Sequence, residues 1–147
     1  MINLKLKDGS IREIDEAMPA SEIIKNIGMG LYKAACCVKI DGLVCDLREV
    51  IDHDCEFEVL TFDSKAGKEV FWHTASHLMA QAVQNLFPEA KLARGPATET
   101  GFYYDFEVEK PFTQGDLAKL EVEMKRISKE GIALERFELS ADEAIKF

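Results

Sequence analysis

The first 62 residues alternate between hydrophobic and polar positions in short segments. Tight-turn residues, Asp8-Gly9 and Asp41-Gly42, separate two pairs of these segments and favour β-hairpins. Residues 21–27 instead place isoleucines on one helical face and are followed by Gly28 and Gly30, which we expect to end the helix. Strands are predicted at residues 2–6, 11–14, 35–40, 43–47 and 55–62. The order β-β-α-β-β-β predicts an α+β unit of the β-grasp, ubiquitin-like type.

The second half has hydrophobic residues mainly at helical spacing. The pattern predicts a helix of about five turns from Glu69 to Pro88 and a second amphipathic helix over residues 116–131. Ser140 and Glu143 have the spacing of a capping box, which opens a third helix. Between the helices we expect a turn-rich loop at 95–101, an aromatic strand at 102–108 and a strand at 134–139.

The two patterns meet at a short segment without large apolar residues. We therefore expect one domain at residues 1–62, a linker at 63–68 and a second α+β domain at 69–147. Only seven residues follow Ser140, too few for the last helix to finish. The second domain is accordingly expected to be truncated.

Composition narrows the classes of function. Eighteen basic and 27 acidic residues give a net charge of −9. This charge argues against electrostatic binding of nucleic acid by the whole surface, so any RNA contact must be local. The four cysteines form no C-x-x-C pair and indicate neither a zinc ribbon nor a disulfide framework. No uncharged stretch approaches the roughly 20 residues that span a bilayer. We expect a reducing, cytoplasmic setting.

The main candidate for chemistry is a histidine pair, His73 and His77, next to Trp72. Residues four apart on a helix lie above one another, so both imidazoles can converge on one water, one metal ion or one substrate carbonyl. The Glu that metalloprotease helices carry after the first His is absent, and no third ligand lies nearby in sequence. Spacing alone leaves structural, catalytic and metal-binding roles open.

Two further features could form a cleft beside these histidines. The loop from Gly95 to Gly101 could cradle a phosphate or ribose, but it matches no phosphate-binding motif and also fits a plain tight loop. Tyr103 and Tyr104 are adjacent on a predicted strand and so face opposite sides. Only one of them can line a cleft over the histidine helix.

These residues together resemble a known family. The first unit looks like a TGS domain, and two runs look like the opening of the editing domain of the bacterial threonyl-tRNA synthetase family. The runs are Phe-Trp-His-Thr-Ala-Ser-His-Leu-Met-Ala at 71–80 and Gly-Pro-Ala-Thr-Glu-Thr-Gly-Phe-Tyr-Tyr-Asp-Phe at 95–106. The resemblance covers nearly the whole chain. It implies an N-terminal fragment, because the family's downstream Cys-x-x-x-His motif and aminoacylation core do not occur here.

The resemblance implies a function and a set of site residues. The fragment would contribute half of a site that hydrolyses mischarged seryl-tRNA, with His73 and His77 catalytic and Tyr104, Gly95 and Asp105 binding substrate. The fragment itself would need no cofactor and would be inactive alone. The intact enzyme would use ATP, magnesium and zinc in its catalytic core, bind the acceptor end of tRNA(Thr), threonine and serine, form a homodimer and stay off membranes.

Two other functions remain open at this point. TGS units also resemble regulatory or RNA-binding modules without catalysis, but those would not be expected to continue into a histidine-pair helix. A zinc-dependent deacylase of the alanyl editing type would use His73 and His77 as metal ligands. Stoichiometric zinc would favour this second alternative.

Overall fold

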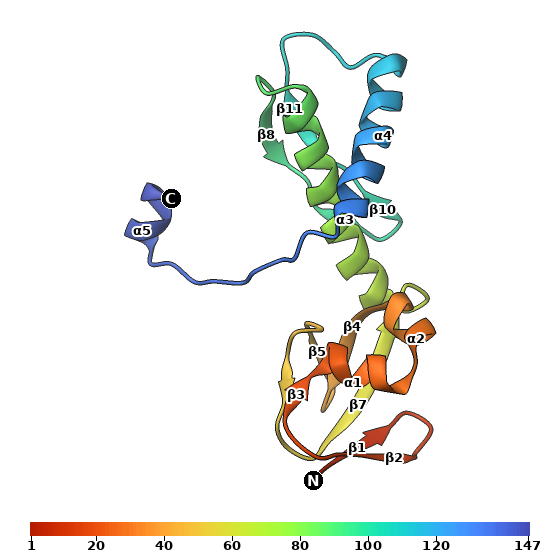
Figure 1. The fold of residues 1–147 in the computed structure, drawn as a ribbon. Coiled ribbons are helices and arrows are strands. Elements are labelled where there is room, and N and C mark those ends of the chain that lie inside the picture. Colours follow the sequence, from red (N-terminus) through yellow and green to blue (C-terminus); the bar gives the residue numbers. More distant parts are fainter.

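The computed structural model describes all of residues 1–147 and shows two folded units, one at the beginning of a long helix and the other packed along the rest of it (Figure 1). This helix, α3, runs from Lys65 to Leu86. The N-terminal unit packs at its beginning and the second unit along its remaining length. Helix α3 thus belongs to both units and carries the histidine pair between them.

The N-terminal unit is built on a five-stranded mixed sheet with the order β2-β1-β7-β4-β5. Strands β1 and β7 pair in parallel and the other neighbours are antiparallel. Both predicted hairpins form, so the expected α+β class is confirmed at this level. The strands are β1 (Ile2–Leu6), β2 (Ile11–Ile14), β4 (Ala35–Ile40), β5 (Leu43–Cys45) and β7 (Cys55–Thr61).

Helix α1 (Ala20–Ile27) covers one face of this sheet. Its Ile23 and Ile24 are fully buried and belong to the same core as Leu4 and Phe57 of the sheet. Side chains recur on one face every 3.6 residues in the helix and every 2 residues in the strands, and this brings these four side chains to one interface. Two-residue strands, β3 (Met18–Pro19) and β6 (Val50–Ile51), pair beside the helix.

The chain after α1 differs from the expectation. Gly28 ends α1, but it also precedes a second helix, α2 (Met29–Ala34), whose Tyr32 N–H donates to the Gly28 carbonyl. Gly28 has an extended backbone, so it turns the chain without continuing α1. Gly30 therefore lies inside a helix, and the prediction that it stops one is wrong.

The second unit packs helix α4 (Gln114–Glu130) against α3. Its small core combines Ala82 and Val83 of α3 with Leu120 and Ile127 of α4. The expected strand at 102–108 is interrupted at Tyr103 and Tyr104, and its two parts pair with different partners: β10 with β9 and β11 with β8. These four short strands are β8 (Lys91–Arg94), β9 (Ala97–Thr98), β10 (Gly101–Phe102) and β11 (Asp105–Glu107).

Two segments depart from the sequence-based expectations. Most of the expected linker at 63–68 is helical, because the Ser64 side chain caps α3 and the helix starts at Lys65. Residues 134–139 form no strand, since no neighbouring strand offers its backbone to them. The capping box at Ser140 and Glu143 does form, and it opens helix α5 (Ala141–Lys146).

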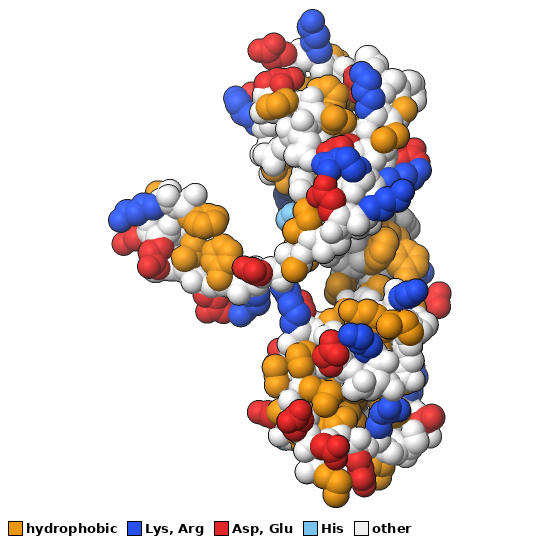
Figure 2. Space-filling model, viewed as in Figure 1, with side chains coloured by type: hydrophobic (Ala, Val, Ile, Leu, Met, Phe, Trp, Pro, Cys, Tyr) orange, Lys and Arg blue, Asp and Glu red, His pale blue; other side chains and the backbone are white.

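Residues 132–147 form an arm that extends away from both units (Figure 1). Its large hydrophobic side chains are uncovered (Figure 2). One hydrogen bond ties the arm to the N-terminal unit, from the Arg48 guanidinium to the Leu134 carbonyl at 2.6 Å. Helix α5 is short and has no buried residue, so it adds little to the core of either unit.

Candidate functional site

Helix α3 presents His73 and His77 on the same exposed face. Their Nε2 atoms lie 3.2 Å apart and their ring centroids 4.7 Å apart. The spacing of four residues brings the rings together, as the helical period requires. The structure therefore places the two imidazoles as the sequence predicted.

The contact between the two Nε2 atoms limits the protonation states of the pair. One ring donates its Nε2–H, and the other must accept with an unprotonated Nε2. The accepting Nε2 has its lone pair occupied in this arrangement, and an imidazole nitrogen whose lone pair is free can take a proton from a bound water. Since both rings are exposed, a substrate can reach them.

Sequence reasoning missed one residue of this helical turn, Ser76. It is fully buried, and its hydroxyl donates to the His73 carbonyl at 2.7 Å. The bond satisfies this buried hydroxyl and ties it to the backbone that carries His73. Ser76 precedes Ala80 and Val83 by four and seven residues, so it lies on their face of the helix and not on the face of His77. This spacing could have indicated a buried position.

Gly95 and Tyr104 form a second contact among the expected site residues. A Cβ at Gly95 would lie 2.0 Å from Cδ2 of the Tyr104 ring, so only glycine lets the backbone approach that ring. The same ring also stacks on Phe106, with centroids 4.9 Å apart and planes at 22°. The Phe106 ring in turn contacts Phe112, and Phe112 contacts Phe87 at the end of α3. Two contacts, with Gly95 and with Phe106, therefore hold the Tyr104 ring in place.

Tyr103 points elsewhere and is 45% exposed. Its N–H donates to the Pro96 carbonyl at 3.5 Å, and this bond joins the residue before β9 to the residue after β10. This difference from the packed Tyr104 supports the prediction that the adjacent tyrosines face different environments.

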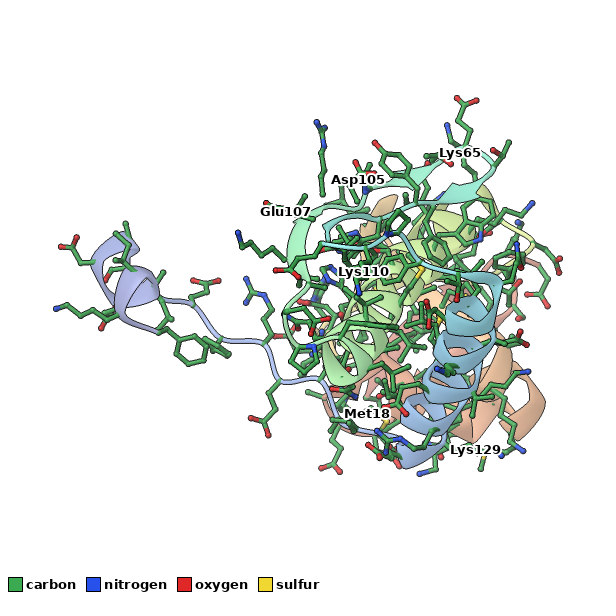
Figure 3. The ribbon with its side chains drawn as sticks, turned by 90° about the horizontal axis from the view of Figure 1, so that it is seen from above. Met18, Lys65, Asp105, Glu107, Lys110 and Lys129 are labelled. Carbon is green, nitrogen blue, oxygen red and sulfur yellow. The ribbon has the colours of Figure 1, made fainter.

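Asp105 is exposed on β11, the same strand that carries Glu107 (Figure 3). No hydrogen bond joins Asp105 to the histidine pair. The structure thus brings together His73 with His77 and Gly95 with Tyr104, and leaves Asp105 exposed on β11.

The structure offers no complete metal centre. No three His, Cys, Asp or Glu side chains lie in an arrangement that could hold a metal ion. His53, in the N-terminal unit, instead contacts two carboxylates: its Nδ1 lies 2.7 Å from Asp52 and its Nε2 3.7 Å from Asp41. The hydrogen bond with Asp52 is the main cause that raises the pKa of His53. All four cysteines are free thiols.

No helix combines the length and the apolar character needed to cross a bilayer.

Comparison with known proteins finds close relatives along the whole chain. It is 51% identical to the threonine--tRNA ligase of Acetivibrio thermocellus over 147 residues and 50% identical to that of Clostridium perfringens over 146 residues. It is 49% identical to that of Carboxydothermus hydrogenoformans over 147 residues. The chain belongs to the threonine--tRNA ligase family. It spans 23% of the length of each of these relatives. No protein-family model matches it.

Membership of the threonine--tRNA ligase family confirms the resemblance that residues 71–80 and 95–106 carry. The name of these relatives describes an aminoacyl-tRNA synthetase, a ligase that joins threonine to tRNA for protein biosynthesis. The roles of His73, His77, Tyr104, Gly95 and Asp105 in editing stay predictions.

Proposed function

We propose that this chain supplies half of the site with which a threonine--tRNA ligase hydrolyses serine from mischarged tRNA. The observation that supports this most directly is the pair of exposed imidazoles with Nε2 atoms 3.2 Å apart. The N-terminal unit, with its mixed sheet covered by α1, would be the TGS β-grasp domain at residues 1–62. Residues 69–147 would be the first part of the editing domain.

The need for such a site follows from the size of the two amino acids. Serine lacks one methyl group that threonine has, and one such contact discriminates by about 1–3 kcal/mol. That is too little for accurate translation, so a second site must remove serine after it is attached. A site of this kind rejects threonine by its larger size.

In the proposed reaction the histidine pair activates water. When the two rings turn apart, the Nε2 that was accepting is freed and takes a proton from a water whose oxygen attacks the seryl ester carbonyl. The bond between the carbonyl carbon and the ribose oxygen then breaks, and the proton passes to that oxygen, which leaves as a hydroxyl. The packed ring of Tyr104, with Gly95 behind it, would form one wall for the seryl group, and Asp105 would lie at its rim.

The proposal assigns partners and cofactors to the longer protein. The acceptor end of tRNA(Thr), threonine and serine are its ligands, it acts in the cytoplasm as a homodimer, and ATP, magnesium and zinc serve its aminoacylation core. This chain alone, with a net charge of −9, should bind tRNA weakly and with strong salt dependence.

The test uses a threonine--tRNA ligase that contains this chain. His73→Ala and His77→Ala should each slow deacylation of seryl-tRNA and let it accumulate, while threonine activation is unchanged. His53→Ala is the matched control, because that exposed histidine lies in the other unit. Normal deacylation in both His73 and His77 variants would remove these residues from the reaction. One zinc ion bound per isolated 147-residue chain, which lacks the aminoacylation core, would instead favour the zinc-dependent deacylase.

A further inference from the structure

The junction between the two units is unusually short and well bonded. Strand β7 ends at Thr61 and helix α3 begins at Lys65, so only residues 62–64 connect them. A flexible linker would contain small or polar residues with few contacts. Here Phe62 and Ser64 of the connection, and Gly67 in the first turn of the helix, make specific contacts with the strand end or with the helix.

Ser64 joins the end of the strand to the start of the helix. Its hydroxyl donates to the Thr61 carbonyl at 2.8 Å and accepts from the Gly67 N–H at 3.0 Å. Its backbone N–H also donates to the Thr61 carbonyl, at 3.1 Å. These bonds fix the direction in which α3 leaves the sheet.

Gly67 brings the first turn of α3 against the backbone of β7. A Cβ at this position would lie 1.9 Å from the Thr61 oxygen and 2.6 Å from the Thr61 carbon. Both are backbone atoms, which cannot move aside as the end of a flexible side chain can. Gly67 is buried, and only a residue without a side chain permits this approach.

Phe62 links the same junction to the turn of α3 that precedes the histidines. Its ring meets Phe71 edge-on, with centroids 5.2 Å apart, and Trp72 with centroids 5.7 Å apart. The Lys68 ammonium lies 5.7 Å from the centre of the Phe62 ring. Trp72 directly precedes His73, so these contacts reach the edge of the candidate site.

We propose that residues 61–72 form a rigid junction that makes the two units one body. In this view Phe62, Ser64 and Gly67 are positioning residues: they set where the histidine pair stands relative to the N-terminal sheet. His73 follows Lys65 by eight residues, about 12 Å along the helix. A tRNA that touches the N-terminal unit would meet the histidines at a constant distance. This last consequence rests on the proposed function, whereas the rigidity does not.

The test measures orientation in the 147-residue chain by NMR. Residual dipolar couplings from the two units should fit one alignment tensor, and ¹⁵N relaxation should give both units the same rotational correlation time. Two different tensors in the unsubstituted chain would overturn the proposal. Because this measurement involves no hydrolysis, its result is separate from the outcome of the histidine substitutions.

Two variants then locate the rigidity. Gly67→Ala should cause loss of the common tensor while each unit keeps its own pattern of chemical shifts. Gly30→Ala is the matched control, because it is also a helical glycine and no atom lies within 4 Å of its added Cβ. If Gly67→Ala unfolds the chain, Phe62→Ala, which removes only ring contacts, should produce the same loss. A common tensor in Phe62→Ala and in a folded Gly67→Ala would refute the role of the junction.

Discussion

Replacing Gly95 by alanine tests the packing of the candidate pocket. The added methyl carbon would lie 2.0 Å from Cδ2, 2.5 Å from Cγ and 2.6 Å from Cε2 of Tyr104. Three ring atoms at this distance exclude a small adjustment, so the ring must leave its place. Since Phe106 stacks against that ring at 4.9 Å, the movement also disrupts the aromatic stack.

The cost can be estimated from two contributions. Forcing an extra carbon into a packed site costs about 1–3 kcal/mol. Loss of a stacked aromatic pair adds about 0.5–1.5 kcal/mol. We therefore expect Gly95→Ala to lower the free energy of unfolding of the second unit by about 2–4 kcal/mol. The same substitution in a Tyr104→Ala background should cost below about 1 kcal/mol, because the obstructing ring is gone.

A double-mutant cycle measures this difference. Urea unfolding of the parent chain, both single variants and the double variant gives the coupling between Gly95 and Tyr104, which we expect to be about 2 kcal/mol. Ring proton shifts of Tyr104 and Phe106 report whether the stack is lost. If Gly95→Ala costs the same with and without the tyrosine ring, the close approach is not what requires glycine here.

Two further predictions concern stability. Hydrogen bonds from Arg126 and Asn85 lower the pKa of Glu123 from 4.5 to about 2, so the stability that Glu123 contributes is present above pH 4.5 and is lost as the pH falls towards 2. Glu123→Gln should flatten the fall of the urea midpoint across that range, and an unchanged acid profile would contradict this. Phe57 is 1% exposed in the core of the N-terminal unit, so Phe57→Ala should destabilise that unit by about 3–5 kcal/mol in urea titrations; a loss below about 1 kcal/mol would show that the core is not packed as described.

Elements with a strong local signal could be predicted from the sequence. The hairpins around Asp8-Gly9 and Asp41-Gly42 form because turn residues and alternating strands favour the same structure. The histidine pair follows from helical spacing alone, and so does the capping box at Ser140. In each case all the determining residues lie within a few positions of one another.

Features that depend on distant contacts escaped prediction. Residues 134–139 carry a strand-like sequence, but a strand needs a neighbour, which no local pattern reports. The glycine at position 28 separates two helices instead of ending helical structure, because its extended backbone redirects the chain into α2. The role of Gly95 also depends on Tyr104, nine residues away, whose ring occupies the space of a missing side chain.

The parallel pairing of β1 with β7 has a consequence for biosynthesis. Leu4 pairs with Cys55, and three side-chain contacts between the two segments, from Asn3, Lys5 and Lys7, each span 51 residues. A ribosome adds about 5–20 residues per second, so the first strand waits for several seconds before its central partner emerges from the exit tunnel. The amino-terminal hairpin must stay soluble during that interval, and synthesis of the intervening residues, which is slower than closure of the loop, should limit the rate at which the domain matures on the nascent chain.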